Sequence, residues 1–348
     1  MKPLNFTLRQ HTPMLHFQAS QERATLRASD VKPRFDRWLI KKVWKDNFDE
    51  CCSYLVGYSD KFSEKERKDF KKKFDGGFRA LNYKMRIDCF EDRTHTVKMD
   101  QESANKNHKL LNLPLEKTLP FPSEDHSLVM SNIGGRLHEE VVNFVFYDHV
   151  EVKLLVEQVQ LSDAIKDNFA KFISSVNFGN RKSKGFGSFI VTKKNGEEVF
   201  LDELYDTQWI MYVTLETESN KTEINIDEVY RDIFTIINKI WRELKKNYKG
   251  KRKDIKSVLL GRSNEMNFLR IPSPITFKPI ILEKTLTACE FAIGFIYEKD
   301  VITKGCQSGT ETVYNKYINK IKGENLVKSL AGDKKIQLYN VLQELTIE

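Results

Sequence analysis

The chain has 348 residues, which exceeds the usual single core and fits two domains, each large enough to bury a core of its own. A hydrophobic content of 40%, with 23 Phe and 12 Tyr, excludes a disordered chain, and no apolar run approaches the ~20 residues that a membrane span requires. The net charge of +8 is moderate, but it is concentrated in windows that lack acids, which favours a polyanionic partner over a role in solubility.

The start of the chain and its cysteines favour a cytoplasmic protein. Residues 1–6 contain no apolar signal core, so we expect the chain to stay where it is made. The five cysteines are scattered and form no C-x-x-C pair that could hold zinc or iron. We therefore expect reduced thiols, no bound metal, no cofactor and no membrane partner.

The first half of the chain predicts the order strand, helix, two strands, helix and strand. Residues 5–11 alternate polar and apolar side chains, and Thr12-Pro13 then ends the strand. Ser29 or Asp30 can cap a helix that extends to about Phe48. The remaining elements are a charged exposed helix or mobile excursion at 59–75, a strand at 83–90, a polar loop at 100–127, a hairpin of 142–146 with 150–156, a helix at 164–176 capped by Ser162 or Asp163, and a strand at 187–192.

The second half repeats part of this order. It predicts a strand at 209–216, a helix at 227–246 with an apolar face, a second hairpin of 275–282 with 289–297, and helices at 311–321 and 326–344, without a clear closing strand. We therefore predict an α+β protein of two ferredoxin-like (RRM-like, β-α-β-β-α-β) domains with insertions. The expected domains are residues 1–200, with insertions at about 55–80 and 95–130, and residues 201–348.

One face of the first predicted helix collects positive charge. Four cations from Arg34 to Lys45 are spaced three and four residues apart, so they share a face away from the apolar stripe. A solvated surface explains such a face, and so does contact with an RNA backbone. The RNA contacts predicted in this segment are Arg27, Lys32, Arg34, Arg37 and Lys41.

The glycine-rich loop at 178–188, Phe-Gly-Asn-Arg-Lys-Ser-Lys-Gly-Phe-Gly-Ser, is the feature around which the sequence is organised. No Asp or Glu occurs between Asn168 and Gly196, whereas six cations do. Glycines permit positive φ and leave N–H groups unshielded, so a phosphodiester can approach the main chain. Phe186 is expected to stack on a base or to anchor the loop. The predicted RNA contacts are Gly179, Asn180, Arg181, Lys182, Lys184, Gly185, Phe186 and Gly187, and a surface turn with solvated lysines is the alternative.

The order of elements around this loop argues against two nucleotide-binding motifs. A Walker loop or a dinucleotide fingerprint requires strand, loop and then helix, because the N-terminus of the helix binds the phosphate. Here the predicted order is helix, loop and strand. Nucleotide hydrolysis and hydride transfer are therefore disfavoured.

A rigid segment in the second half offers two further cations. Arg270 precedes Pro272-Ser273-Pro274, where each proline fixes its own φ and restrains the residue before it. The segment is either a lead-in to the next strand or a stiff rim that holds Arg270 and Lys278 toward RNA.

Three stretches, taken together, resemble the repeat-associated (RAMP) proteins of CRISPR systems. Residues 12–38, with Thr-Pro followed by Leu-Arg-Ala-Ser-Asp-Val-Lys, resemble the opening of those proteins. The Lys-Gly-Phe-Gly-Ser that ends at Ser188 is similar to their glycine-rich loop. Residues 268–275, Phe-Leu-Arg-Ile-Pro-Ser-Pro-Ile, are similar to a segment of the first subunit of the type III-B (Cmr) effector complex.

The resemblance implies a function as well as a fold. It implies two ferredoxin-like domains, no metal, and an antiviral role in holding CRISPR RNA (crRNA) and aiding target RNA capture within a multi-subunit type III effector. The expected partners are crRNA, target RNA and the other subunits. The sequence departs from the family where a glycine pair usually follows Thr-Pro, since Met14-Leu15-His16 stands there. A divergent branch, or another RAMP subunit, fits this departure.

A metal-independent crRNA-processing endoribonuclease is the alternative function. Its general base would be His11 or His16, beside the first strand and within reach of a glycine-rich loop in this fold. Related processing enzymes carry that loop near the C-terminus, whereas here a long second half follows it. A structural or surface histidine is the favoured interpretation, so we expect no catalytic residues.

Overall fold

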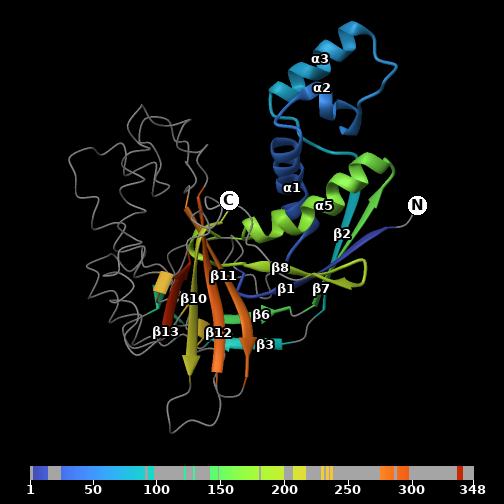
Figure 1. Cartoon of the computed structure of the whole chain (residues 1–348). Helices are drawn as coiled ribbons and strands as arrows, with labels where there is room; N and C mark the ends of the chain where they lie inside the picture. Colours follow the sequence, from blue (N-terminus) through green and yellow to red (C-terminus); the bar gives the residue numbers. More distant parts are fainter. Residues whose placement is uncertain are drawn as a thin grey trace, which may run out of the picture.

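The computed structural model describes fifteen stretches of the chain (Figure 1). They are residues 3–14, 25–90, 93–97, 121–122, 128–129, 142–147, 149–179, 182–199, 207–216, 229–230, 233–234, 236–237, 275–285, 288–297 and 335–339. The fold is α+β with antiparallel sheets, as the sequence predicted.

The first half is built on a five-stranded antiparallel sheet in the order β2-β7-β1-β8-β9. Its strands are β1 (Leu4–Gln10), β2 (Tyr83–Phe90), β7 (His149–Val156), β8 (Phe189–Lys194) and β9 (Glu197–Glu198). Helices α1 (Ala28–Val43) and α5 (Val159–Ser175) pack on the same side of this sheet (Figure 1).

Periodic apolar residues explain this packing. Alternate residues of β1 are buried, and Phe6 lies with its ring centroid 4.6 Å from that of Phe169 on α5. Phe35 of α1 inserts between Phe169 and Phe172, at 5.2 and 5.0 Å between centroids. These aromatic contacts fix the two helices to the sheet through ring packing and burial.

A small helical lobe follows α1. It comprises α2 (Phe48–Cys51), the short 3-10 helix η1 (Cys52–Tyr54) and α3 (Glu64–Asp75), and Figure 1 shows α2 and α3 beyond the end of α1, away from the sheet. A capping box between Ser63 and Glu66 begins α3. Phe70 and Phe74 are buried against Phe48, so one face of the helix predicted to be exposed packs into the hydrophobic core of the first half.

The second half contains a four-stranded antiparallel sheet in the order β11-β12-β10-β13. Its strands are β10 (Thr207–Glu216), β11 (Ile275–Lys284), β12 (Ala288–Tyr297) and β13 (Lys335–Tyr339). The described residues of the helix predicted at 227–246 are helical, and all six are buried: Val229, Tyr230, Ile233, Phe234, Ile236 and Ile237. Two short sheets pair β3 (Arg93–Val97) with β6 (Val142–Phe146) and β4 (Phe121–Pro122) with β5 (Leu128–Val129).

Three local predictions are wrong. The hairpin of 142–146 with 150–156 does not form, because β6 pairs with β3 while β7 lies between β2 and β1. Residues 335–339, predicted as helix, form the closing strand β13 on the edge of β10. The N-caps of α1 and α5 are Arg27 and Gln158, so the predicted capping residues lie inside the helices. The loop at 100–127, apart from Phe121–Pro122, and the helix at 311–321 lie outside the described residues.

Candidate nucleic-acid interface

The glycine-rich loop connects the C-terminal end of α5 to β8. Gly179, Gly185 and Gly187 have φ values of 76°, 89° and 67°, so the predicted positive φ is confirmed at all three positions. A Cβ atom at Gly187 would clash with the carbonyl oxygen of Phe178. Only glycine therefore fits where the chain folds back on itself.

The Thr-Pro turn after β1 holds this loop in place. The hydroxyl of Thr12 donates to the carbonyl of Gly185 (2.6 Å) and accepts from the backbone N–H of Ser188 (2.9 Å). The N–H of Gly187 donates to the carbonyl of Pro13 (2.8 Å). The two sequence motifs that resemble the RAMP proteins are thus in direct contact, although about 170 residues separate them.

Phe186 anchors the loop against the second half. Its side chain is 3% exposed, and its ring stacks on Phe234 at 4.2 Å between centroids with a 19° interplanar angle. A Cβ atom at Gly185 would come within 2.8 Å of both Ile237 and Pro279. Of the two roles predicted for Phe186, the structure shows the anchor, because a ring stacked and buried in this way is unavailable to a base.

Lys278 on β11 is buried, and the prediction that it lies on an exposed rim is wrong. Its ammonium donates to the carbonyls of Ile173 (2.8 Å), Val176 (2.6 Å) and Phe189 (2.8 Å). Three carbonyls match its three N–H donors, and two of them lie at the end of α5, where the helix dipole favours a cation. Burial, together with the charge of Arg34, lowers the pKa of Lys278 well below its ordinary value.

Asn177 ties the same junction together from the loop side. Its amide donates to the carbonyls of Lys182 and Phe277, each at 2.7 Å. The backbone carbonyl of Asn177 accepts from the guanidinium of Arg34 (2.7 Å). This guanidinium also lies 4.8 Å from the Phe178 ring centroid. Arg34 is therefore a link between α1 and the loop.

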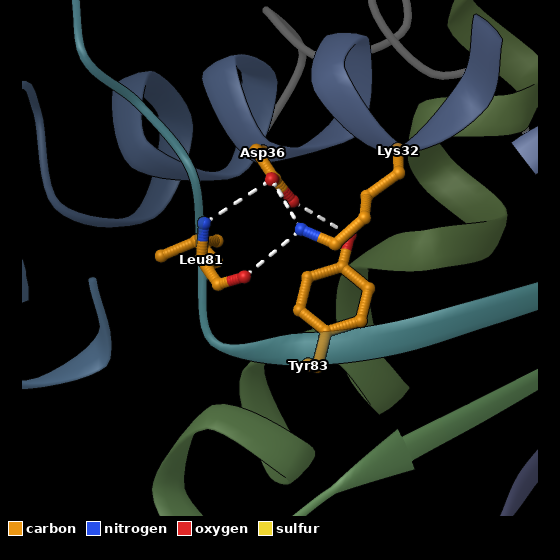
Figure 2. A network of polar contacts seen from close by, with 4 residues as sticks. All are labelled: Lys32, Asp36, Leu81 and Tyr83. Atoms are coloured by element: carbon orange, nitrogen blue, oxygen red, sulfur yellow. Dashed lines mark hydrogen bonds and ion pairs between the residues drawn. The ribbon is translucent and has the colours of Figure 1, made fainter. Parts of the chain in front are cut away.

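Lys32 contacts other residues of the protein in a partly buried polar network (Figure 2). Its ammonium donates to Asp36 Oδ2 (2.7 Å) and to the carbonyl of Leu81 (2.9 Å), and it lies 4.1 Å from the ring centroid of Tyr83. Asp36, 2% exposed, also accepts from the N–H of Leu81 (3.1 Å) and the hydroxyl of Tyr83 (2.7 Å). Burial raises the pKa of the Asp36 carboxyl, against the opposing effect of Lys32.

Five further cations predicted as RNA contacts are described, and four of them are exposed. Arg27, Arg37 and Lys41 are exposed on or beside α1, Lys182 is exposed on the loop, and Lys184 is half-buried. The bond from Arg34 to Asn177 joins these two groups of cations. The exposed cations of α1 can neutralise the phosphates of a nucleic acid, whereas the glycines and Phe186 hold the loop in its conformation. Asn180, Arg181 and Arg270 lie outside the described residues.

His11, the residue named for the endoribonuclease alternative, is 4% exposed. Its Nδ1 accepts from the backbone N–H of Ile281 (3.0 Å), which links the end of β1 to β11. Burial, with the charges of Arg9 and Lys278, lowers its pKa to about 3. Such a histidine is a weak base without access to RNA, whereas His16 lies outside the described residues.

Comparison with known proteins identifies the family. A family model described as the Cmr1 N-terminal domain matches residues 1–248. The chain belongs to the Cmr1 family. No curated protein matches the sequence. A solved structure described as Cmr1 from Pyrococcus furiosus (apo form) is 11% identical, with 86% of this chain and 89% of that chain covered and a TM-score of 0.39.

A second solved structure is described as the type III-B Cmr-beta bound to cognate target RNA. It is 11% identical, covers 56% of this chain and 60% of that chain, and has a TM-score of 0.29. The RAMP resemblance inferred from the sequence is confirmed by the family match, and the Cmr1-family chain is divergent.

Among the described residues of this Cmr1-family chain, no helix is long and apolar enough to cross a membrane. No group of three or more His, Cys, Asp or Glu side chains in the same stretches is arranged to hold a metal ion.

Sequence reasoning missed two residues that organise the site. Thr12 is predicted to end a strand and to form part of the RAMP resemblance, without a contact to the loop, and Asn177 is not singled out. Thr12 donates to the carbonyl of Gly185 in the loop, and Asn177 donates to the carbonyls of Lys182 in the loop and Phe277 on β11. A threonine before proline and an asparagine at a helix end are common turn residues, so neither signal distinguishes a long-range contact from a local one.

Proposed function

We propose that this chain is a non-catalytic RNA-binding subunit of a cytoplasmic type III-B CRISPR effector complex, which holds crRNA and assists target RNA capture. The observation that carries the proposal is the match of the Cmr1 N-terminal domain over residues 1–248. The exposed cations of α1 and of the loop support it, because phosphate neutralisation supplies much of the affinity for RNA. The other subunits of the effector are the expected protein partners.

We also propose that residues 1–200 and 201–348 are two ferredoxin-like domains. The first sheet places its strands in the order β2-β7-β1-β8, with α1 after β1 and α5 after β7. The second sheet has the same order, β11-β12-β10-β13, with helical residues between β10 and β11. Both orders are those of a split β-α-β-β-α-β unit, which supports a duplicated architecture.

The structure gives no support to the endoribonuclease alternative at His11. A general base must come within hydrogen-bond reach of the proton that it abstracts. The imidazole of His11 is buried, and its Nδ1 is occupied by the N–H of Ile281. A non-catalytic role is therefore the simpler proposal, and RNA cleavage by a His16→Ala variant tests the other histidine.

The test is RNA binding by the full chain, measured by fluorescence anisotropy with a single-stranded crRNA in EDTA. Arg37→Glu with Lys41→Glu should weaken binding about tenfold or more without lowering the thermal midpoint, because exposed charges contribute little to stability. Lys68→Glu with Lys72→Glu on α3 is the matched control, since both are exposed and each has an acidic partner on the same helix.

Two results would overturn the proposal. A parent chain that binds neither crRNA nor target RNA, alone or within a reconstituted complex, would remove the RNA-holding role. Cleavage of a repeat-containing RNA in EDTA that is abolished by His11→Ala or His16→Ala would establish the endoribonuclease instead.

A further inference from the structure

The first sheet has a second face, turned away from α1 and α5 and here called the open face, whose described side chains on β1, β2 and β7 are exposed or half-buried. Side chains alternate between the two faces of a strand. Phe6 on β1 points to α5, so Asn5, Thr7 and Arg9 point to the other side. On β2 and β7 the side chains of this open face are Lys84, Arg86, Asp88, Phe90, His149, Glu151, Lys153 and Leu155.

Charges on the open face are arranged in like-charged pairs across the strands. Arg86 lies opposite Lys153, and Asp88 lies opposite Glu151. Like charges directly opposite one another destabilise a sheet. Each cation instead pairs with the acid on its own strand, since Arg86 lies 2.9 Å from Asp88 and Lys153 lies 2.9 Å from Glu151.

The balance of charge on this face is positive. Arg86 and Lys153 remain 77% and 49% exposed, and the exposed side chains of Lys84 and Arg9 have the same sign. On the neighbouring strand β8, Lys193 lies opposite Glu198, so that pair adds no net charge. Across β2, β7 and β1, the open face thus carries four cations and two acids.

Exposed apolar side chains flank these charges. The Phe90 side chain is 46% exposed, and its ring lies 5.4 Å from the ring of His149, which is opposite it in register. Leu155, 51% exposed, lies opposite Lys84 at the other end of the strand pair. A ring beside cations on an open sheet provides stacking and phosphate neutralisation on one surface.

We propose that this open face is a binding surface for single-stranded RNA, with Arg86 and Lys153 at phosphates and Phe90 stacked on a base. The proposal rests on the proposed function that the chain holds RNA. The four-stranded sheets of RNA-recognition modules bind RNA by stacking bases on exposed aromatic side chains. A protein partner fits less well, because Lys, Glu and Asp are depleted at the centres of protein interfaces and here occupy the centre.

The charge contribution is tested with Arg86→Gln and Lys153→Gln in the full-length chain, with a single-stranded RNA oligonucleotide as probe. Removing two phosphate contacts should flatten the slope of log affinity against log salt by about 1.4, since each contributes about 0.7. Lys68→Gln with Lys72→Gln on α3 is the matched control, because it removes two exposed, ion-paired cations from another surface. The control should keep the parent slope.

The stacking contribution is tested separately with Phe90→Leu, which keeps an apolar side chain but removes the ring. Loss of one stacked base should weaken binding about tenfold. Phe78→Leu is the control, because Phe78 is a similarly exposed ring on the helical lobe (37%). Thermal unfolding of all variants should stay near that of the parent.

The outcomes are distinguishable. Normal RNA binding and salt slope in the Arg86, Lys153 and Phe90 variants would overturn the open-face proposal and leave the proposed function intact. Failure of the parent to bind RNA would overturn both. Unchanged RNA binding together with lost assembly into the effector complex would show that the open face is a subunit interface. Equal losses of RNA affinity in the charge variants and in their controls would show that only the net charge of the chain matters, which would also overturn the open-face proposal.

Discussion

The ammonium nitrogen of Lys278 lies 2.6 Å from the carbonyl oxygen of Val176, so a lysine of the second half caps a helix end in the first half. Lys278→Met should lower the free energy of unfolding by about 3 kcal/mol or more, because three buried carbonyls lose their donor and each costs about 1–3 kcal/mol. Urea denaturation measures the loss. Lys65→Met, on the exposed face of α3, should change it by less than about 0.5 kcal/mol. A similar, small effect of both changes would contradict the capping role.

The pair of Lys32 and Asp36 should behave as a structural unit, not as part of an RNA surface. Lys32→Met should lower the free energy of unfolding by about 3 kcal/mol, because it leaves the buried Asp36 carboxylate without its cation. Since burial raises the pKa of Asp36, the loss should shrink at low pH, where the carboxyl takes up a proton.

The control for this pair is Arg37→Met, which removes an exposed cation from α1 next to Asp36 in the sequence. It should leave stability unchanged within about 0.5 kcal/mol. The double variant Lys32→Met with Asp36→Leu should recover part of the loss by removing the unpaired charge. A Lys32→Met variant as stable as Arg37→Met would show that the ion pair of Lys32 with Asp36 in Figure 2 contributes nothing to stability.

Gly187 and Gly196 allow backbone strain to be separated from a steric clash. Both have positive φ, 67° and 89°, but a Cβ atom at Gly196 meets open space whereas one at Gly187 meets the Phe178 carbonyl. Gly196→Ala should lower the free energy of unfolding by about 1–3 kcal/mol, because alanine is strained at a positive φ. Gly187→Ala should cost clearly more, or prevent folding. Equal thermal midpoints for the two variants would contradict the close approach at Gly187.

His11 should make the protein sensitive to acid. Its pKa is lowered to about 3 by burial, while an unfolded chain titrates near the ordinary value of 6.5. Below pH 6.5 the unfolded state therefore binds a proton that the folded state excludes. The stability that His11 contributes is complete above pH 6.5 and is lost progressively as the pH falls toward 3.

His11→Asn isolates this effect, because an amide oxygen can accept from the N–H of Ile281 but does not titrate. The free energy of unfolding, measured by urea denaturation between pH 7 and pH 4.5, should fall less steeply in this variant than in the parent. Parallel curves would mean that His11 is protonated equally in the folded and unfolded states.

Elements set by local pattern were predictable from the sequence. The alternation in β1 and β2, the four-residue spacing of buried residues in α1, and the hairpin of β11 with β12 each depend on neighbouring residues. The false hairpin of 142–156 and the missed strand β13 depend on partners far along the chain. Periodicity shows which face of a strand is buried, but it does not show which strand lies beside it.

The backbone conformation of the glycines in the site could be predicted from the sequence, but the burial of its cations could not. Positive φ at Gly179, Gly185 and Gly187 fits their residue type, because glycine has no Cβ atom to oppose it. The burial of Lys278 does not, because lysine is almost never fully buried unless it is paired. Its three carbonyl partners come from α5, the following loop and β8, none of them near residue 278 in the sequence.

The late position of β13 has a consequence for the order in which the chain is made. β10 pairs on one side with β12 and on the other with β13, which is encoded only at Lys335–Tyr339. During synthesis, the backbone N–H and C=O groups on one edge of β10 therefore stay unpaired until β13 is made. Another chain can pair with such an edge. Long-range strand pairing is also intrinsically slow. Ribosome-bound chains that stop before residue 335 should therefore need a chaperone to keep them from aggregating, whereas release of the complete chain closes that edge.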